Sequence, residues 1–138
     1  MGGDVRGIST DPRPDPSFYE RSLDDVLVAK VPFLLAFITP AFCKSAQCGP
    51  TIDVVKTAVN AAPIRVVAVE PYQLVYQDGR FQPVIRDGNF VPVEAANVYG
   101  IPTEPWLFVV GADGTIVESF EAIVGEQELV NAIRAVTR

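Results

Sequence analysis

The two cysteines, Cys43 and Cys48, are the residues best suited to do chemistry. They lie in the segment 39-TPAFCKSAQCGPTID-53, with four residues between them. Such a pair can be an inert disulfide staple, part of a metal site, a pair of free thiols or a reactive thiol pair. The surrounding residues and the predicted elements must decide among these four possibilities.

The chain contains no histidine, so both the commonest metal ligand and the commonest general base are missing. Two cysteines alone do not complete a four-ligand zinc site. A cysteine–histidine nucleophile pair is excluded for the same reason. We therefore expect thiol chemistry without imidazole, with no metal and no cofactor.

Composition narrows the class of protein further. The 138 residues are 49% hydrophobic and carry a net charge of −6. This length suggests one domain that buries a core without help from disulfides, which weakens the staple interpretation. An acidic chain repels the phosphate backbone, so nucleic acid is not an expected partner. No run of 18 or more apolar residues is present, so we expect no membrane-spanning helix.

The positions of helices and strands follow from hydrophobic periodicity, caps and turn residues. Ser22 has the pattern of an N-cap, with Asp25 at the third helical position. A continuous apolar run is typical of a strand covered on both faces, and Asp-Gly pairs mark tight turns. The order predicted from these signals is helix 23–30, strand 32–38, helix 50–62, strand 64–70, short hairpin pieces within 71–92, helix 93–99, strand 106–111, strand 115–121 and helix 126–138.

This order predicts an α/β fold in which helices cover both faces of a mixed central sheet. We assign residues 1–20, which are polar and rich in Gly and Pro, to a flexible N-terminal arm. Such an arm is either a native tail or the remainder of a trimmed export segment. Residues 21–138 then form a single domain with an insertion at about 71–92.

The predicted order, with a cysteine directly after the first core strand, resembles the thioredoxin fold. Three segments carry the likeness: FLLAFITPAFC, the triplet Cys48-Gly49-Pro50, and GIPTEPWLFVVGADG. The resemblance covers roughly residues 20–138 and implies a three-layer sandwich with a redox-active cysteine pair. It also implies a cis-proline beside the reactive sulfur, where a backbone edge is exposed to substrate.

Two prolines compete for that cis position. Pro102 stands in Gly-Ile-Pro-Thr, the local sequence of thioredoxins. Pro105 lies nine residues before Gly114 of the predicted hairpin turn, about the spacing found in related membrane-tethered thioredoxin-like proteins. Because spacing is a geometric demand, we expect the Glu104–Pro105 bond to be the cis one.

The cysteine segment is also similar to the bacterioferritin-comigratory class of peroxiredoxins, which are thiol peroxidases of the same fold. Those proteins carry a Thr-Pro pair before the peroxidatic cysteine and often a resolving cysteine five residues later. Here Thr39 lies four residues before Cys43 rather than three, and Ala36 occupies the proline position of the family motif. This departure puts the peroxide-binding geometry in doubt.

Helix geometry restricts how the two cysteines can be joined. Residues five apart on an unbroken α-helix have Cα atoms about 8.6 Å apart, beyond the roughly 7 Å limit for a disulfide. Pro50 also disfavours a helix running through 43–48. We therefore expect a loop there, with the helix beginning at Pro50 and Cys48 just outside it, where the helix N-terminus stabilises a thiolate. Lys44 either adds a nearby positive charge or extends its long side chain into solvent.

The sequence predicts that Cys43 is the nucleophile and Cys48 the resolving cysteine, although the helix end alone favours Cys48 for the attack. Substrate-contacting candidates are Gly49, Pro50 and Pro105, as the resemblance implies. Phe42 is either another contact or a core residue. Glu104 is a substrate contact, a carboxylate that relays protons to the sulfur, or a solvated loop residue.

These observations predict a thiol–disulfide oxidoreductase that exchanges disulfides with a protein or small-molecule thiol. The alternatives are a peroxiredoxin-like thiol peroxidase and a non-catalytic thioredoxin-fold binding module. We expect a monomer in an extracytoplasmic location, periplasmic or at the cell surface, with the cytoplasm as the alternative.

Overall fold

The computed structural model describes residues 9–43, 45–101 and 103–138. The first eight residues of the expected arm, Lys44 and the competing proline Pro102 lie outside the described residues. The elements are the 3-10 helix η2 (Pro16–Tyr19), α1 (Leu23–Ala29), β1 (Phe33–Phe37), α2 (Cys48–Ala61), β2 (Arg65–Val69), β3 (Leu74–Gln77), β4 (Arg80–Pro83), β5 (Ile85–Arg86), β6 (Asn89–Phe90), α3 (Glu94–Tyr99), β7 (Trp106–Val110), β8 (Ile116–Glu121) and α4 (Glu126–Thr137).

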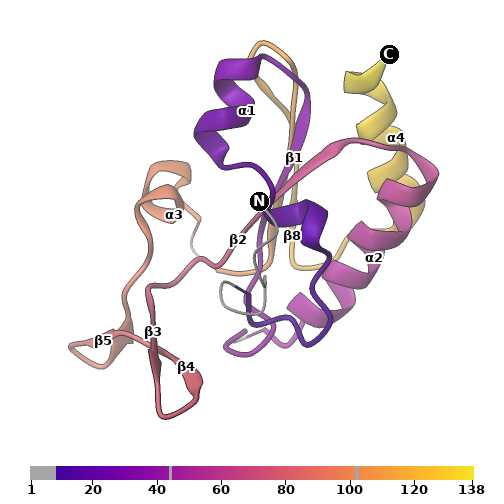
Figure 1. The fold of residues 1–138 in the computed structure, drawn as a ribbon. Helices are drawn as coiled ribbons and strands as arrows, with labels where there is room; N and C mark the ends of the chain where they lie inside the picture. The colour runs from indigo at the N-terminus through magenta and orange to yellow at the C-terminus, as the bar shows by residue number, and fades with distance from the viewer. Residues whose placement is uncertain (1–8, 44, 102) are drawn as a thin grey trace.

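The central sheet has four strands in the order β2-β1-β7-β8. β1 pairs parallel with β2 and antiparallel with β7, and β8 pairs antiparallel with β7. All five residues of β1 are buried, as its continuous apolar sequence predicts. The α/β class with a mixed sheet is therefore confirmed, and β1 occupies the middle of that sheet (Figure 1).

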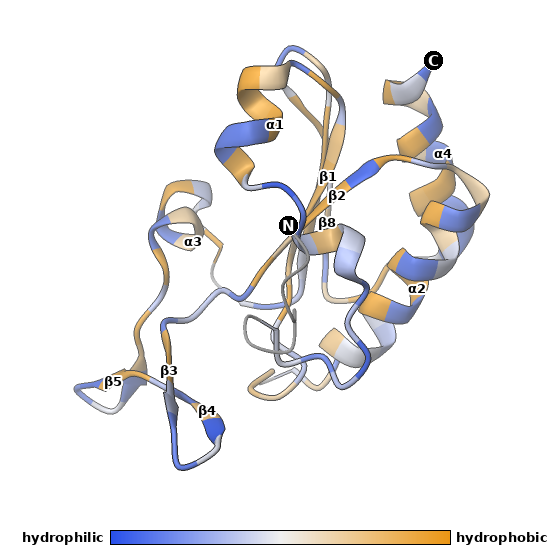
Figure 2. Ribbon diagram, in the orientation of Figure 1, coloured by the Kyte–Doolittle hydropathy of each residue, from blue (hydrophilic) through white to orange (hydrophobic). Residues whose placement is uncertain are grey.

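Alternation along β1 divides the core into two halves, one on each face of the sheet. Leu34, Ala36 and Ile38 face the cluster that includes residues of α2 and α4. Phe33, Leu35 and Phe37 face the cluster that includes residues of α1 and α3. Figure 2 shows hydrophobic residues concentrated along the central strands, while the helices carry both kinds of residue. Helices therefore cover both faces of the sheet.

Local signals explain where several elements begin and end. Ser22 and Asp25 form the expected capping box at the start of α1. Gly100 ends α3 in the left-handed conformation, with φ +65°. Two residues in this conformation also form each Asp-Gly turn of the segment 71–92, at Asp78-Gly79 and Asp87-Gly88. These turns connect β3 to β4 and β5 to β6, two hairpins that extend away from the central sheet (Figure 1).

The N-terminal segment 9–20 differs from the flexible arm expected from its composition. Phe18 is only 2% exposed and belongs to the core cluster under α2 and α4. Arg65, the first residue of β2, donates to the Glu20 carboxylate at 3.1 Å. Residues 9–20 are therefore part of the packed domain, because one aromatic side chain and several polar ones find partners far along the chain.

Candidate redox site

Cys43 and Cys48 are joined by a disulfide. Their Cα atoms are 6.0 Å apart, which lies within the range for a disulfide and below the separation of an unbroken helix. The segment between β1 and α2 is accordingly a loop, as predicted. The disulfide joins this loop, which follows the central strand, to the first residue of α2.

The start of α2 is a correction to the sequence prediction. The helix begins at Cys48 rather than at Pro50, and the Thr51 amide already donates to the Gln47 carbonyl at 2.9 Å. Pro50 is thus the third helical residue, where an N–H would have no acceptor within the helix. Its ring would clash with the Ala46 carbonyl only in a continuous helix, and Ala46 has φ +60°. Cys48 consequently lies inside the first turn.

The two sulfur-bearing residues differ in accessibility. Cys48 is fully buried beneath the loop, at 0% exposure, whereas Cys43 is half-buried. An external thiol or disulfide can therefore approach Cys43, and Cys48 is shielded by the protein. This asymmetry agrees with the assignment of Cys43 to the first attack and Cys48 to resolution.

The side chain of Cys43 lies against the segment that precedes β7. Its sulfur is 4.0 Å from the Glu104 carbonyl oxygen and 3.3 Å from the Ser45 hydroxyl oxygen. The Glu104–Pro105 peptide bond is cis, the geometry expected at this position. The loop after β1 and the segment before β7 thus meet at the Cys43 sulfur, where the two contacting residues are 61 positions apart in sequence.

Glu104 is buried, at 3% exposure, so it is not a solvated loop residue. Its carboxylate accepts a hydrogen bond from the phenol of Tyr72, at the start of the insertion. Burial, followed by this hydrogen bond and the negative charge of Glu104, raises the pKa of Tyr72. Tyr72 therefore stays protonated and holds the Glu104 side chain against the start of the insertion.

An aromatic cluster adjoins the loop between β1 and α2, residues 38–47, which we call the redox loop after its candidate role. Phe90 of β6 makes edge contacts with Phe42 and Tyr72, at ring-centroid distances of 6.4 and 5.1 Å. Phe42 is half-buried and belongs to neither half of the main core. It packs with the insertion, beside Cys43, instead of under the sheet. Its position is compatible with a contact to substrate.

Gly49 and Pro50 lie one and two residues beyond Cys48, in the first turn of α2. Gly49 borders a small hollow formed with residues 11–13, Pro40 and Lys56. This hollow faces the N-terminal segment, whereas Cys43 faces Glu104. Pro105 is buried directly after Glu104. Of the residues predicted for the site, Cys43, Glu104 and Pro105 come together, and Gly49 and Pro50 lie near the other cysteine.

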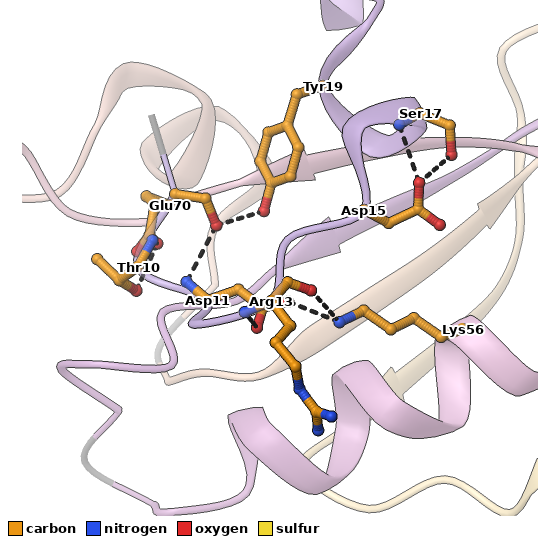
Figure 3. Close-up of polar contacts among 9 residues, drawn as sticks. Thr10, Asp11, Arg13, Asp15, Ser17, Tyr19, Lys56 and Glu70 are labelled. Atoms are coloured by element: carbon orange, nitrogen blue, oxygen red, sulfur yellow. Dashed lines mark hydrogen bonds and ion pairs between the residues drawn. The ribbon is translucent and has the colours of Figure 1, made fainter. Parts of the chain in front are cut away.

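A second carboxyl group, that of the half-buried Glu70, lies on the N-terminal side of the loop. Thr10 donates through its amide and its hydroxyl to one oxygen of Glu70, at 2.7 and 2.6 Å (Figure 3). The Thr10 hydroxyl also accepts from the Ala41 amide at 3.1 Å. Burial raises the pKa of Glu70, although the hydrogen bonds from Thr10 oppose this shift. Thr10 therefore links Glu70, just after β2, to the loop between β1 and α2 at Ala41.

Thr39 faces Glu70 as well. Its side chain is fully buried and, like that of Thr10, opposes the rise in the pKa of Glu70. Thr39 Oγ1 and Glu70 Oε2 do not meet hydrogen-bond geometry with any described residue. The threonine of the peroxiredoxin-like segment is thus near the second carboxyl group.

Sequence reasoning missed Ser45, Thr10 and Glu70 as neighbours of the site. Ser45 lies two residues after Cys43, in the same loop, which was the only sequence signal for it. Glu70 follows a buried parallel strand, so its position at the edge next to the loop was also available from the sequence. Thr10 gave no signal, because it belongs to the segment expected as an arm.

Among residues 9–43, 45–101 and 103–138, no group of three or more His, Cys, Asp or Glu side chains gathers to hold a metal ion. No helix of this part of the chain has the length and apolar composition needed to cross a membrane. A comparison of the chain with protein-family models and with curated proteins gave no match.

Proposed function

We propose that the protein is a thiol–disulfide oxidoreductase whose Cys43–Cys48 pair exchanges disulfides with a protein or small-molecule partner. The observation that carries the proposal is the asymmetric disulfide: an accessible Cys43 is bonded to a buried Cys48 at the first turn of α2, beside the cis Glu104–Pro105 bond. An inert staple needs neither the accessible sulfur nor this neighbour.

In the reducing direction, the Cys43 thiolate attacks a disulfide of the partner. A mixed disulfide forms between Cys43 and the partner, and one partner thiolate leaves. The Cys48 thiolate then attacks the Cys43 sulfur, which closes the Cys43–Cys48 disulfide and releases the second partner thiolate. Two electrons pass from the cysteine pair to the partner, whose thiolates take up two protons. The oxidising direction is the reverse.

The position of each cysteine suits this sequence of steps. Cys48 is the first residue of a 14-residue helix and therefore lies at the positive end of the helix dipole. This position favours the thiolate form that the resolving step requires. A partner reaches the sulfur of the half-buried Cys43 before that of the buried Cys48.

The fold supports the proposal through the resemblance to thioredoxins. Strand β1, helix α2 and strand β2 follow one another with β1 and β2 parallel, and α3, the β7–β8 hairpin and α4 complete the order on which the resemblance rests. We infer an extracytoplasmic location, periplasmic or at the cell surface, because disulfides persist in oxidising compartments. We also infer that the protein acts as a monomer.

The peroxidase alternative has less support. A thiol peroxidase of the kind considered needs the threonine hydroxyl beside the attacking sulfur, and Thr39 is buried next to Glu70. Peroxide consumption that disappears in Cys43→Ser would reverse this preference. Partner binding that survives replacement of both cysteines by serine would favour the non-catalytic binding module.

The decisive experiment is a redox titration of the chain in glutathione or dithiothreitol buffers, followed by an assay of protein disulfide reduction. An exchanger has a potential near −120 to −270 mV, whereas a structural disulfide lies below about −300 mV. We expect a value in the first range and turnover that is lost in Cys43→Ser. Cys48→Ser, the matched control, should accumulate the mixed disulfide between Cys43 and the partner. A potential below about −300 mV together with absent turnover would refute the proposal.

A further inference from the structure

Ser45 is placed between the reactive sulfur and the segment that carries the cis bond. Its hydroxyl oxygen is 3.3 Å from Cys43 Sγ, and its hydroxyl group donates to the Glu104 carbonyl oxygen at 2.8 Å. The Gln47 amide donates to the same hydroxyl oxygen at 3.3 Å. The oxygen is thus fixed on one side by a backbone amide, and its single proton has two possible acceptors.

The oxidised state determines which acceptor the proton takes. A disulfide sulfur carries no proton and no charge, and it is a weak acceptor. The Glu104 carbonyl is the stronger acceptor, and the Ser45 hydroxyl donates to it in this structure. Reduction changes the balance, because a thiolate carries a full charge and hydrogen bonds to charged groups are roughly twice as strong as neutral ones.

We propose that Ser45 is a third catalytic residue, whose hydroxyl turns from the Glu104 carbonyl to Cys43 when the disulfide opens and there stabilises the thiolate. The turn requires only rotation about the Cβ–Oγ bond, since both acceptors already lie within reach. The inference rests on the proposed function, because a thiolate at Cys43 has a role only if the pair exchanges disulfides.

The charges around Cys43 give this hydroxyl a clear task. Among the described residues, the titratable side chains on the segments that meet at the sulfur are Cys48, which becomes a thiol on reduction, and Glu104, whose carboxylate accepts from Tyr72. None of these three groups carries a positive charge that would stabilise a thiolate, and Tyr72 stays protonated. The Ser45 hydroxyl lies within hydrogen-bond distance of the Cys43 sulfur. Its hydrogen is therefore placed to stabilise the Cys43 thiolate in the reduced state.

The test measures the pKa of the Cys43 thiol and does not require turnover. The reference chain carries Cys48→Ala, so that Cys43 is the single thiol and no new hydroxyl is introduced. The rate of alkylation by iodoacetamide is followed against pH in this chain, in its Ser45→Ala derivative and in its Ser45→Thr derivative. Circular dichroism of each chain verifies the fold, and Cys48→Ser provides a second background if Cys48→Ala does not fold.

We expect Ser45→Ala to raise the Cys43 pKa by about one pH unit, a tenfold change in the ionisation constant. Ser45→Thr, which retains the hydroxyl, should keep the pKa close to that of the reference chain. An unchanged pKa in Ser45→Ala would overturn the proposal, and so would an equal rise in Ser45→Thr. A failure of the proposed function would appear in the redox potential of the two-cysteine chain, so the two failures are distinguishable.

Discussion

The N-terminal segment 9–20 and the insertion 71–92 flank the redox loop and have similar polar, turn-rich sequences, yet they relate to the domain differently. Phe18 in the first is 2% exposed, whereas Tyr76 and Ile85 in the second are 69% and 60% exposed. Figure 1 shows the hairpins of the insertion extending outward. Polar composition alone therefore does not tell a packed segment from a projecting one.

Both segments nevertheless bind a carboxyl group next to the redox loop. Thr10 of the N-terminal segment holds Glu70, and Tyr72 at the start of the insertion holds Glu104. Glu70 connects to the loop through Thr10 and the Ala41 amide, while the backbone of Glu104 touches Cys43 itself. We therefore expect the contact of Thr10 with Glu70 to contribute to the stability of the fold, and the contact of Glu104 with Cys43 to contribute to the proposed disulfide exchange.

The largest effect should come from removing the core contribution of the N-terminal segment. Phe18→Ala deletes a fully buried ring next to the residues of α2 and α4, so we expect a loss of about 3–5 kcal/mol in the free energy of unfolding. Urea denaturation followed by circular dichroism measures this change. A loss below about 1 kcal/mol would show that residues 9–20 are the flexible arm that their composition suggests.

The next effect concerns the tether between this segment and the loop. Thr10→Val keeps the shape of the side chain and removes the hydroxyl that donates to Glu70 and accepts from Ala41. We expect a loss of about 1–3 kcal/mol, because a half-buried carboxylate and a backbone amide each lose a partner. Thr10→Ser is the matched control and should stay close to the parent chain. Equal losses in both variants would contradict the assignment of the effect to the hydroxyl, because Thr10→Ser retains that group.

The raised pKa of Glu70 makes stability depend on pH. Its folded pKa lies above the ordinary value of 4.5 because the side chain is buried. The folded state therefore binds this proton more tightly than the unfolded state, and the stability contributed by Glu70 falls as pH rises from about 4.5 through the folded pKa. We expect Glu70→Gln to gain stability relative to the parent chain across that interval.

The measurement is the difference in free energy of unfolding between the two chains at a series of pH values. Asp25 and Asp113, whose pKa values are lowered by hydrogen bonds, contribute with the opposite sign but equally in both chains. They cancel in the difference. A difference that stays constant with pH would contradict the raised pKa of Glu70.

The sequence predicted the central sheet and its helices because their signals are local. The apolar run of β1, the Ser22 capping box and the turn glycines each act within a few residues. The sequence predicts the start of α2 two residues late, at Pro50, because a proline ring clashes with the carbonyl four residues earlier in a continuous helix. The left-handed turn at Ala46 removes this clash, so the helix begins at Cys48. The cysteine loop follows from helix geometry, whereas the cis bond is an expectation that the resemblance to thioredoxin-like proteins and their spacing implies.

The neighbours of the sulfur were beyond local reasoning. Ser45 donates to the carbonyl oxygen of Glu104, which is 59 residues away in the sequence. The Glu104 carboxylate in turn accepts from Tyr72, at the start of the insertion. Thr10 pairs with a carboxyl group 60 residues along the chain. Contacts of this kind depend on tertiary packing, which neither periodicity nor capping patterns encode.

The smallest effect belongs to the outer part of the insertion. Tyr76→Ala removes an exposed ring that contacts Phe81 within the β3–β4 hairpin, at a centroid distance of 5.3 Å. Because this hairpin projects from the sheet, we expect the free energy of unfolding to change by less than about 0.5 kcal/mol. Thermal unfolding of the two chains provides the comparison.

The reduction of a small-molecule disulfide should also be unchanged in Tyr76→Ala. The insertion contacts Phe42, the neighbour of Cys43, through Phe90 rather than through Tyr76. A slower reaction confined to protein substrates would extend the site along the hairpin, and a loss of stability above about 2 kcal/mol would place the insertion with the N-terminal segment among the packed parts of the domain.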